Sequence, residues 1–330
     1  MVRLSASAIG RTLVGVAIWI AGVTPAAAVV VSTTTANTSA PADDPGWANV
    51  GNAGVYLGDR WVLTAFHVGA GDIRFGSQVY SPLPGSEVRL HNPAGAGLTE
   101  FTDLLLYRLT ADPGLPSLRV SSTAPPIGAS VIMIGDGRDR QASETHWNVD
   151  ESTSPWTWTE VPLEQPGNYQ GFLTQASFVK RWGTNLIENP APRYAESLYG
   201  DHDLIADLDV YGEVVSLYTQ FDKTGTAYEA QAVIGDSGGA VFYYSGTQWE
   251  LAGLIHAVDL FSGQPPLDAQ GNSLPESAVY GNTTFLSDLA VYRSEILAHV
   301  PEPSCWAMLA GLAATGFVAT GLVARGRRRA

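Results

Sequence analysis

The stretch from Gln231 to Tyr243, QAVIGDSGGAVFY, holds the residue best suited to covalent chemistry. Ser237 stands between glycines, and Asp236 comes directly before it. A serine hydroxyl becomes a good nucleophile when a base takes its proton and nearby N–H groups stabilise the oxyanion that forms. Glycines on both sides let the backbone turn tightly and let a substrate carbonyl come close. The stretch alone also fits a glycine-rich hairpin with an exposed serine, so the rest of the chain has to decide.

A nucleophilic serine needs a base, and the base needs a carboxylate to orient it. Among the six histidines, His67 ends an apolar, strand-like run, WVLTAFHVG. Asp103 stands at the head of a second such run, DLLLYRL. Taken singly, His67 could be a strand-end residue and Asp103 a turn residue. Together with Ser237 they follow in the order His, Asp, Ser, which favours a catalytic set.

At these positions the chain resembles the trypsin/chymotrypsin-like serine proteases. Trp61–His67 is similar to the family segment W-V-L-T-A-A-H, with Phe66 in place of a small residue. Asp103–Leu109 is similar to D-I-A-L-L-x-L, and Gly235–Gly239 matches G-D-S-G-G without change. The resemblance runs from about Trp47 to Val300, with the loops between the second and third motifs largely unmatched.

The resemblance implies an all-β, chymotrypsin-like double β-barrel with a C-terminal helix. It implies a serine endopeptidase that cleaves a protein or peptide substrate through an acyl-enzyme, with no cofactor and no metal. Ser237 would be the nucleophile, and His67 the general base and then the general acid. Asp103 would fix the tautomer of His67 and stabilise its charged form. The backbone N–H groups of Gly235 and Ser237 would form the oxyanion hole.

By the same resemblance, three residues would shape the substrate pocket. Gln231 falls at the pocket-base position, where a neutral amide offers no carboxylate to a Lys or Arg side chain. His256 and Val258 lie on the segment that matches the pocket-wall strand, GLIHAV. We expect His256 to contact Asp103 or to line the pocket, where it would favour acidic side chains. A packed core histidine is at least as well supported.

The start of the chain resembles a secretory signal. Arg3 and Arg11 precede an apolar run, and residues 25–28 (PAAA) supply the small side chains that a signal peptidase needs. We expect a signal at 1–28 and a flexible, Thr/Ser-rich leader at 29–46. In the resembled family a processed Ile-Val terminus pairs with the aspartate before the serine. Val29-Val30 could take that part, although the leader separates it from the domain at 47–300.

The end of the chain differs in kind. The sequence VPEPS is followed by nineteen residues without a charge, 306–324, and then by RGRRRA. Such a run is long enough to span a bilayer, and the arginines would stay on the cytoplasmic side. Residues 301–330 resemble a bacterial PEP-CTERM sorting signal. The resemblance implies a sorting machinery as partner, a membrane contact through 306–324, and an outer-surface or extracellular location with at least transient anchoring.

Composition agrees with an exported globular protein. Hydrophobic residues make up 45% and charged ones 15%, and the formal net charge of −14 argues against binding nucleic acid. Cys305 is the single cysteine, so no intrachain disulfide supports the fold. The residues Asp201, His202, Asp203, Asp207 and Asp209 form an acidic cluster, for which a solvated surface is favoured over a calcium site.

Short apolar runs separated by turns predict a β-rich domain. They comprise a hairpin at 53–69, strands near 72–80, 86–90, 104–109, 130–134, 156–161 and 172–179, and three strands after Ser237. A helix is predicted over 287–300, with Ser287 as its N-cap. Two further functions stay open: a catalytically silent surface-binding protein on the protease fold, and an α/β-hydrolase esterase. The esterase fold needs a helix directly after the serine, where AVFYY reads as a strand.

Overall fold

The computed structural model describes residues 29–189, 191, 194, 198–199, 203–265 and 277–300. The predicted secretory signal at 1–28, the PEP-CTERM-like signal at 301–330 with its spanning segment 306–324, and residues 201–202 of the acidic cluster lie outside these residues. Among the helices that are described, none is long and apolar enough to cross a membrane. The described chain is mostly β-strand with one α-helix, as the sequence predicts.

A four-stranded antiparallel sheet holds the first two motifs. Its strands follow in the order β2 (Val55–Gly58), β3 (Trp61–Ala65), β7 (Phe101–Arg108) and β6 (Val88–His91). The hairpin predicted at 53–69 is confirmed, and its turn places Asp59 and Arg60 at positive φ. Strand β3 pairs with β7 so that Ala65 lies opposite Leu104. His67, two residues after the end of β3, therefore lies beside Asp103 near the start of β7.

An eight-stranded antiparallel sheet carries the third motif. Its strands follow in the order β13 (Arg181–Leu186), β8 (Ser130–Gly135), β18 (Ala240–Tyr244), β19 (Trp249–Asp259), β21 (Thr283–Asp288), β16 (Glu213–Gln220), β15 (Asp203–Asp207) and β14 (Leu198–Tyr199). Strand β18 begins three residues after Ser237, and it pairs with β8 and β19. A strand here contradicts the α/β-hydrolase alternative, which requires a helix after the nucleophile.

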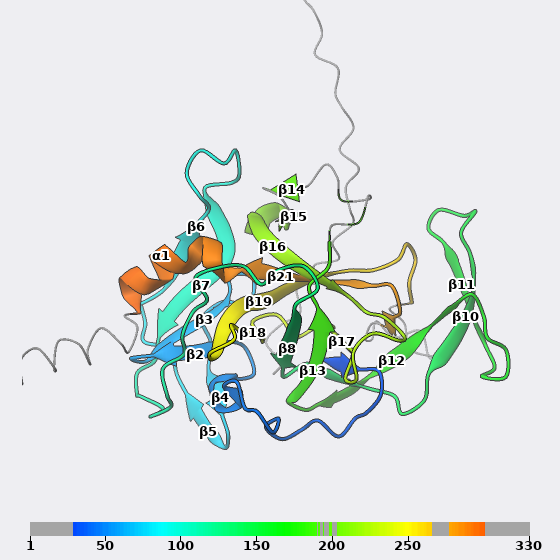
Figure 1. Ribbon diagram of the computed structural model, residues 1–330, viewed down its shortest axis with the longest axis horizontal. Coiled ribbons are helices and arrows are strands. Elements are labelled where there is room, and N and C mark those ends of the chain that lie inside the picture. The colour runs from blue at the N-terminus through cyan, green and yellow to red at the C-terminus, as the bar shows by residue number, and fades with distance from the viewer. Residues whose placement is uncertain are drawn as a thin grey trace, which may run out of the picture.

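Three further sheets, one of five strands and two of two strands, complete the β-structure. They are β11 (Thr157–Val161), β10 (Thr145–Asp150), β12 (Tyr169–Phe178) and β20 (Ser277–Val279), with β9 (Arg138–Arg140) beside β12; β4 (Ile73–Phe75) with β5 (Gln78–Tyr80); and β1 (Val30–Val31) with β17 (Ala230–Gln231). Figure 1 shows the β10–β11 hairpin reaching away from the four-stranded and eight-stranded sheets. Short 3-10 turns lie at Trp47–Asn49 and Asp209–Tyr211.

The four-stranded sheet, the eight-stranded sheet and helix α1 (Leu289–His299) share one hydrophobic core. Buried residues of this core come from β2, β3, β7, β8, β16, β18 and β19 as well as from α1. Leu289, Tyr292 and Ile296 face it, as their spacing predicts. The helix is capped by Asp288, whose carboxylate accepts from the N–H of Ala290 at 2.9 Å. The N-cap prediction of Ser287 is wrong: the cap is Asp288, the last residue of β21, whereas Ser287 is paired with Ser216 of β16.

Residues 29–46 differ from the flexible leader that the sequence suggests. Val29, Val30 and Val31 have no exposed surface, and β1 pairs with β17. Arg140 donates to the carbonyls of Val31 and Ser32. Figure 1 shows the segment, in blue, running from β1 beside β17 towards β2. The three consecutive valines are buried, and two of them form β1. The composition of 29–46 did not indicate this strand, because polar residues follow the valines.

Arg181 offers a test of this packing. It is 1% exposed, contacts Asp139 at 3.0 Å and donates to the carbonyl of Thr35. We expect Arg181→Ala to lower the free energy of unfolding by about 3–5 kcal/mol, because it breaks a mostly buried ion pair. The control Arg119→Ala removes an exposed arginine from Glu250, which keeps its hydrogen bonds with Ser121 and Gln248, and should cost about 1 kcal/mol or less. Equal losses in urea titrations would contradict the role of the buried pair.

Candidate active site

The structure brings His67 and Asp103 together at the ends of β3 and β7. The carboxylate of Asp103 has no exposed surface. Its Oδ2 lies 2.6 Å from Nδ1 of His67, and its Oδ1 accepts from the backbone N–H of His67 at 2.8 Å. A buried carboxylate needs donors of this kind. The contact assigns the proton to Nδ1, which leaves Nε2 free to act as a base.

Ser237 lies in a tight turn between β17 and β18. Three N–H groups of this turn are bonded: Asp236 donates to Val233, Gly238 to Ile255 and Gly239 to Asp236, at 2.8 to 3.0 Å. Within the described part of the chain, the N–H groups of Gly235 and Ser237 donate to no protein acceptor. These are the two donors that the sequence predicts for an oxyanion hole. The turn thus leaves both available to a ligand.

Gly238 brings the serine turn close to the histidine strand. It has a φ of 88°, and a Cβ built on it would lie 2.8 Å from the carbonyl oxygen of Ala53 and 3.0 Å from Oγ1 of Thr64. Thr64 belongs to β3, which leads directly to His67. No hydrogen bond joins Ser237 to His67 among the described residues. Such bonds are often long without substrate and tighten when it binds.

His256 is a packed residue rather than a partner of Asp103. It is 3% exposed, and its Nε2 lies 2.9 Å from Oγ of Ser216. It occupies a β-bulge of β19 opposite Phe285 and Leu286, which turns its side chain out of the regular alternation. Burial, and secondarily the nearby His67, lower the pKa of His256 to about 3. A neutral His256 brings no positive charge to attract an acidic substrate.

The other two predicted pocket residues lie on neighbouring elements. Gln231 is 1% exposed in β17, and its backbone pairs with Val30. Within the described residues, both polar atoms of its side-chain amide lack a hydrogen-bond partner. Val258 is half-buried in β19, opposite Thr284 of β21. The structure therefore shows Gln231 as a buried amide and Val258 as a half-buried strand residue, and their part in a substrate pocket stays a prediction.

Val29 borders the carboxylate of Asp236. A Cβ built on Gly135 would lie 2.0 Å from Oδ1 of Asp236 and 3.3 Å from the backbone nitrogen of Val29. Asp236 is 1% exposed, and its Oδ2 accepts from the N–H of Val233 at 2.8 Å. Only glycine fits between these groups. The sequence suggested Val29-Val30 as the segment that pairs with Asp236, and the buried strand β1 brings Val29 near this carboxylate.

Sequence reasoning missed two residues near the site. Ser216 forms a hydrogen bond with His256 and also donates to the carbonyl of Val214. Nothing in the sequence marks a serine in a central strand as the partner of a histidine. Tyr211 lies over His67, with ring centroids 5.7 Å apart. The Tyr-Gly pair that ends its turn is a weak signal for a rigid bend before a strand.

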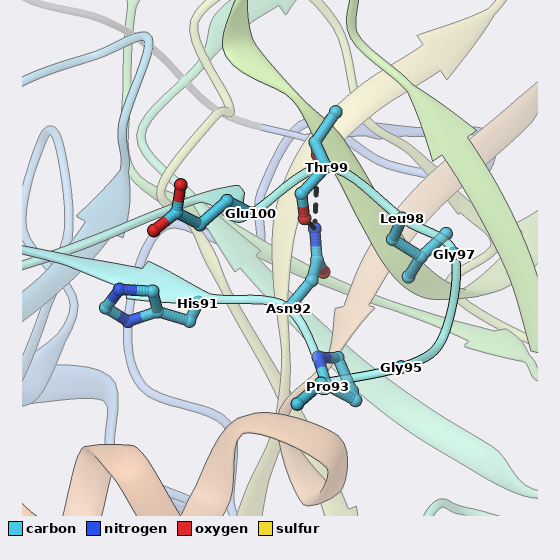
Figure 2. A pocket seen from close by; sticks show the side chains of 9 residues that line it. His91, Asn92, Pro93, Gly95, Gly97, Leu98, Thr99 and Glu100 are labelled. Atoms are coloured by element: carbon cyan, nitrogen blue, oxygen red, sulfur yellow. Dashed lines mark hydrogen bonds between the residues drawn. The ribbon is translucent and has the colours of Figure 1, made fainter.

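The hollow in the loop between β6 and β7 offers few groups for chemistry. Figure 2 shows a hollow in the loop between β6 and β7, where Asn92 bonds to Thr99 and four of the nine lining residues are Gly, Ala or Pro. Its one titratable ring, His91, is occupied by Glu295 at 2.8 Å. The described residues contain no cluster of three or more His, Cys, Asp or Glu that could hold a metal ion.

Comparisons with known proteins return solved structures alone. No family model matches the chain, and no curated protein matches it. Mouse neuropsin, a serine protease, is 19% identical over 74% of this chain and 86% of its own, with a TM-score of 0.41. Human heparin binding protein, as a mutant, is 14% identical over 76% and 85%, with a TM-score of 0.40.

A bacterial structure is similar to the same degree. The inactive form of the Rv3671c protease of M. tuberculosis is 14% identical over 76% of this chain and 83% of its own, with a TM-score of 0.35. These scores and identities are low. We therefore infer function from the geometry of the chain's own residues.

The depressed pKa of His256 predicts a pH-dependent stability. Between about pH 7 and about pH 5 the unfolded chain takes up a proton here that the folded chain does not, which costs about 2 kcal/mol of stability over that interval. His256→Gln should reduce the fall in the free energy of unfolding by this amount. Urea titrations at both pH values measure it. An unchanged pH dependence in the variant would contradict a lowered pKa of His256 in the folded chain.

Proposed function

We propose that this chain is a serine endopeptidase with a chymotrypsin-like, two-barrel fold. The observation that carries the proposal is the fully buried carboxylate of Asp103, which accepts two hydrogen bonds from His67 beside the Ser237 turn. The four-stranded and eight-stranded sheets would correspond to the two barrels. Protein or peptide is the substrate class that fits this chemistry, and no step in it needs a cofactor.

In the proposed reaction, Nε2 of His67 takes the proton of the Ser237 hydroxyl as its oxygen attacks the substrate carbonyl. The tetrahedral oxyanion accepts from the N–H groups of Gly235 and Ser237. The imidazolium then gives its proton to the leaving amine, the C–N bond breaks and an acyl-enzyme remains. Water repeats the sequence: His67 takes its proton, the hydroxide attacks the ester, and Ser237 leaves with the proton. Asp103 stays ionised and stabilises the imidazolium.

The catalytically silent alternative lacks a supporting observation. The histidine is paired, the two donors of the serine turn are available, and Ser237 is partly exposed. A scaffold that had lost catalysis would need none of these groups in this arrangement. We therefore propose hydrolysis rather than silent binding as the function.

The nucleophile can be tested with a fluorophosphonate probe. We expect the folded protein to be labelled at Ser237, and Ser237→Ala to lose labelling and at least about ten-thousandfold in peptide hydrolysis. Ser245→Ala, an exposed serine at the end of β18, is the matched control and should react like the unmodified chain. Folded protein that the probe does not label would favour the silent binding protein.

We further propose that the chain is exported and cleaved after Ala28. The α-ammonium of Val29 would then lie beside Asp236, on the interior side of Gly135. The resembled family uses such a pair to hold its serine turn, and the buried β1 would give it here without a separate propeptide. The C-terminal signal would anchor the protein at the outer surface, at least transiently.

A chain that begins at Val29 and one with Gly-Ser added before Val29 test this pairing. The added residues should lower kcat/KM by about a hundredfold, because they displace the ammonium that positions the turn. Asp236→Asn should cost as much in the first chain and little more in the second, since both changes remove one interaction. Equal kcat/KM in the two chains would contradict a role for the terminal ammonium.

A further inference from the structure

Arg89 is a half-buried cation of β6 whose side chain lies against the start of β7. Its Nε donates to the carbonyl of Thr102 at 2.9 Å, and Thr102 directly precedes Asp103. Its Nη2 donates to the carbonyl of Tyr211 at 2.6 Å, in the turn before β16. A guanidinium carries five N–H donors in one plane. Arg89 therefore joins two segments that lie far apart in the chain.

The ring of Phe66 forms the other side of this contact. The Cζ of Arg89 lies 3.9 Å from the centroid of the ring, and Phe66 directly precedes His67. The N–H of Phe66 donates to the carbonyl of Asp103 at 3.0 Å. A planar guanidinium can stack on a ring and donate hydrogen bonds at once. Phe66, which replaces a small residue of the resembled family, thus provides the surface on which Arg89 rests.

The guanidinium of Arg89 is closely surrounded. Gly212 has a φ of 86°, and a Cβ built on it would lie 2.4 Å from the carbonyl oxygen of Phe101 and 3.3 Å from Nη2 of Arg89. The ring of Phe101 has its centroid 5.4 Å from Cζ of Arg89. A glycine at 212 therefore lets the turn before β16 approach Arg89 and β7 closely.

The charge of Arg89 acts on the same carboxylate that His67 binds. Burial lowers the pKa of Arg89, and attraction to the carboxylate of Asp103 opposes this shift. An arginine nevertheless stays charged in a protein. Asp103 has no exposed surface, and a buried carboxylate is stabilised by hydrogen bonds and by opposite charge. A neutral His67 supplies the hydrogen bonds, and Arg89 supplies a full positive charge.

Other titratable groups lie on the elements packed around Arg89 and His67. His91 of β6 pairs with Glu295 of α1 at 2.8 Å. A carboxylate oxygen of Glu213 accepts from the N–H of Thr99 at 2.7 Å. His256 of β19 is neutral, because burial lowers its pKa to about 3. The remaining group is the phenol of Tyr211, whose ring lies beside His67. Arg89 is the permanent cation in this set.

We propose that Arg89 is a positioning residue of the catalytic set, which holds the His67 turn against β7 and whose charge widens the pH range of the reaction on the acidic side. This role rests on the proposed endopeptidase function. Arg89 acts through its neighbours rather than by contact with substrate. A positive charge disfavours a second positive charge nearby. Because the base must be uncharged to take the serine proton, Arg89 keeps it available at lower pH.

The variants Arg89→Gln and Arg89→Lys separate the charge from the planar guanidinium. We expect Arg89→Gln to lower kcat about tenfold or more with little change in KM. The midpoint of the acidic limb of its kcat/KM profile should move to higher pH by about half a unit to one unit. Arg89→Lys should keep the original midpoint, because the charge remains. It should recover only part of kcat, because an ammonium lacks the planar arrangement of donors.

Arg108→Gln is the matched control. It removes an arginine from the far end of β7, where Arg108 lies over Trp61 and beside the exposed Asp59. It should change neither kcat nor the acidic midpoint. Phe66→Ala tests the stacked ring. It should lower kcat in the unmodified chain and have little further effect in Arg89→Gln, since both changes remove one contact.

The inference is overturned if Arg89→Gln and Arg89→Lys lose kcat equally and keep the acidic midpoint, since Arg89 would then support the fold alone. A midpoint that moves to lower pH, or unchanged rates in Arg89→Gln, overturns it as well. Arg89→Met, whose unbranched stem can still pack on Phe66, repeats the test should the glutamine variant fail to fold. If the folded, unmodified chain neither cleaves peptides nor reacts with a fluorophosphonate, the proposed function itself fails, and this role of Arg89 fails with it.

Discussion

The buried carboxylate of Asp103 is the constraint around which the site is arranged. A charge without solvent contact is costly, and the backbone and side-chain donors of His67 offset that cost. The same two contacts fix the position, the tautomer and the ring plane of His67. Because β3 and β7 are neighbours in one sheet, the ladder of hydrogen bonds between them holds Asp103 within β7 and brings the turn that carries His67 beside it.

Ser237 lies in the turn that leads into β18 of the eight-stranded sheet. Its turn is bonded to itself and to β19, while Gly238 lets it approach β3 more closely than a residue with a side chain could. The shared hydrophobic core keeps the two sheets in this relation. The Tyr211 turn and Arg89 tie them together a second time, directly above His67. A small change in the packing between the two sheets would therefore displace Ser237 relative to His67.

The sequence predicted the local features well and the long-range ones poorly. The hairpin before His67, the strand after Ser237 and the buried face of α1 follow from alternation, turns and helical spacing, which are local properties. The buried β1 was missed because its partner, β17, lies two hundred residues away. Among the site residues, short motifs marked His67, Asp103 and Ser237. Tyr211 could not be found in this way, since its contact depends on how two sheets meet.

The position of His256 illustrates the same limit. The motif left three positions open, namely a partner of Asp103, a wall of the pocket and a packed core residue; the structure shows the packed one, because a bulge in β19 turns the ring towards Ser216 and burial keeps it neutral. A shift of one residue in a strand reverses the direction of a side chain. Such a shift is set by the pairing with β21, which the segment's own residues do not reveal.

The central claim is that Ser237 attacks a substrate carbonyl carbon, that His67 moves the proton, and that the N–H groups of Gly235 and Ser237 bind the carbonyl oxygen. A crystal structure of the protein with a peptide boronic acid tests this most directly. We predict a covalent bond from boron to Oγ of Ser237, with one boron-bound oxygen accepting from the N–H groups of Gly235 and Ser237 and another beside Nε2 of His67. A boronate attached elsewhere, or one whose oxygens miss these donors, would contradict the account.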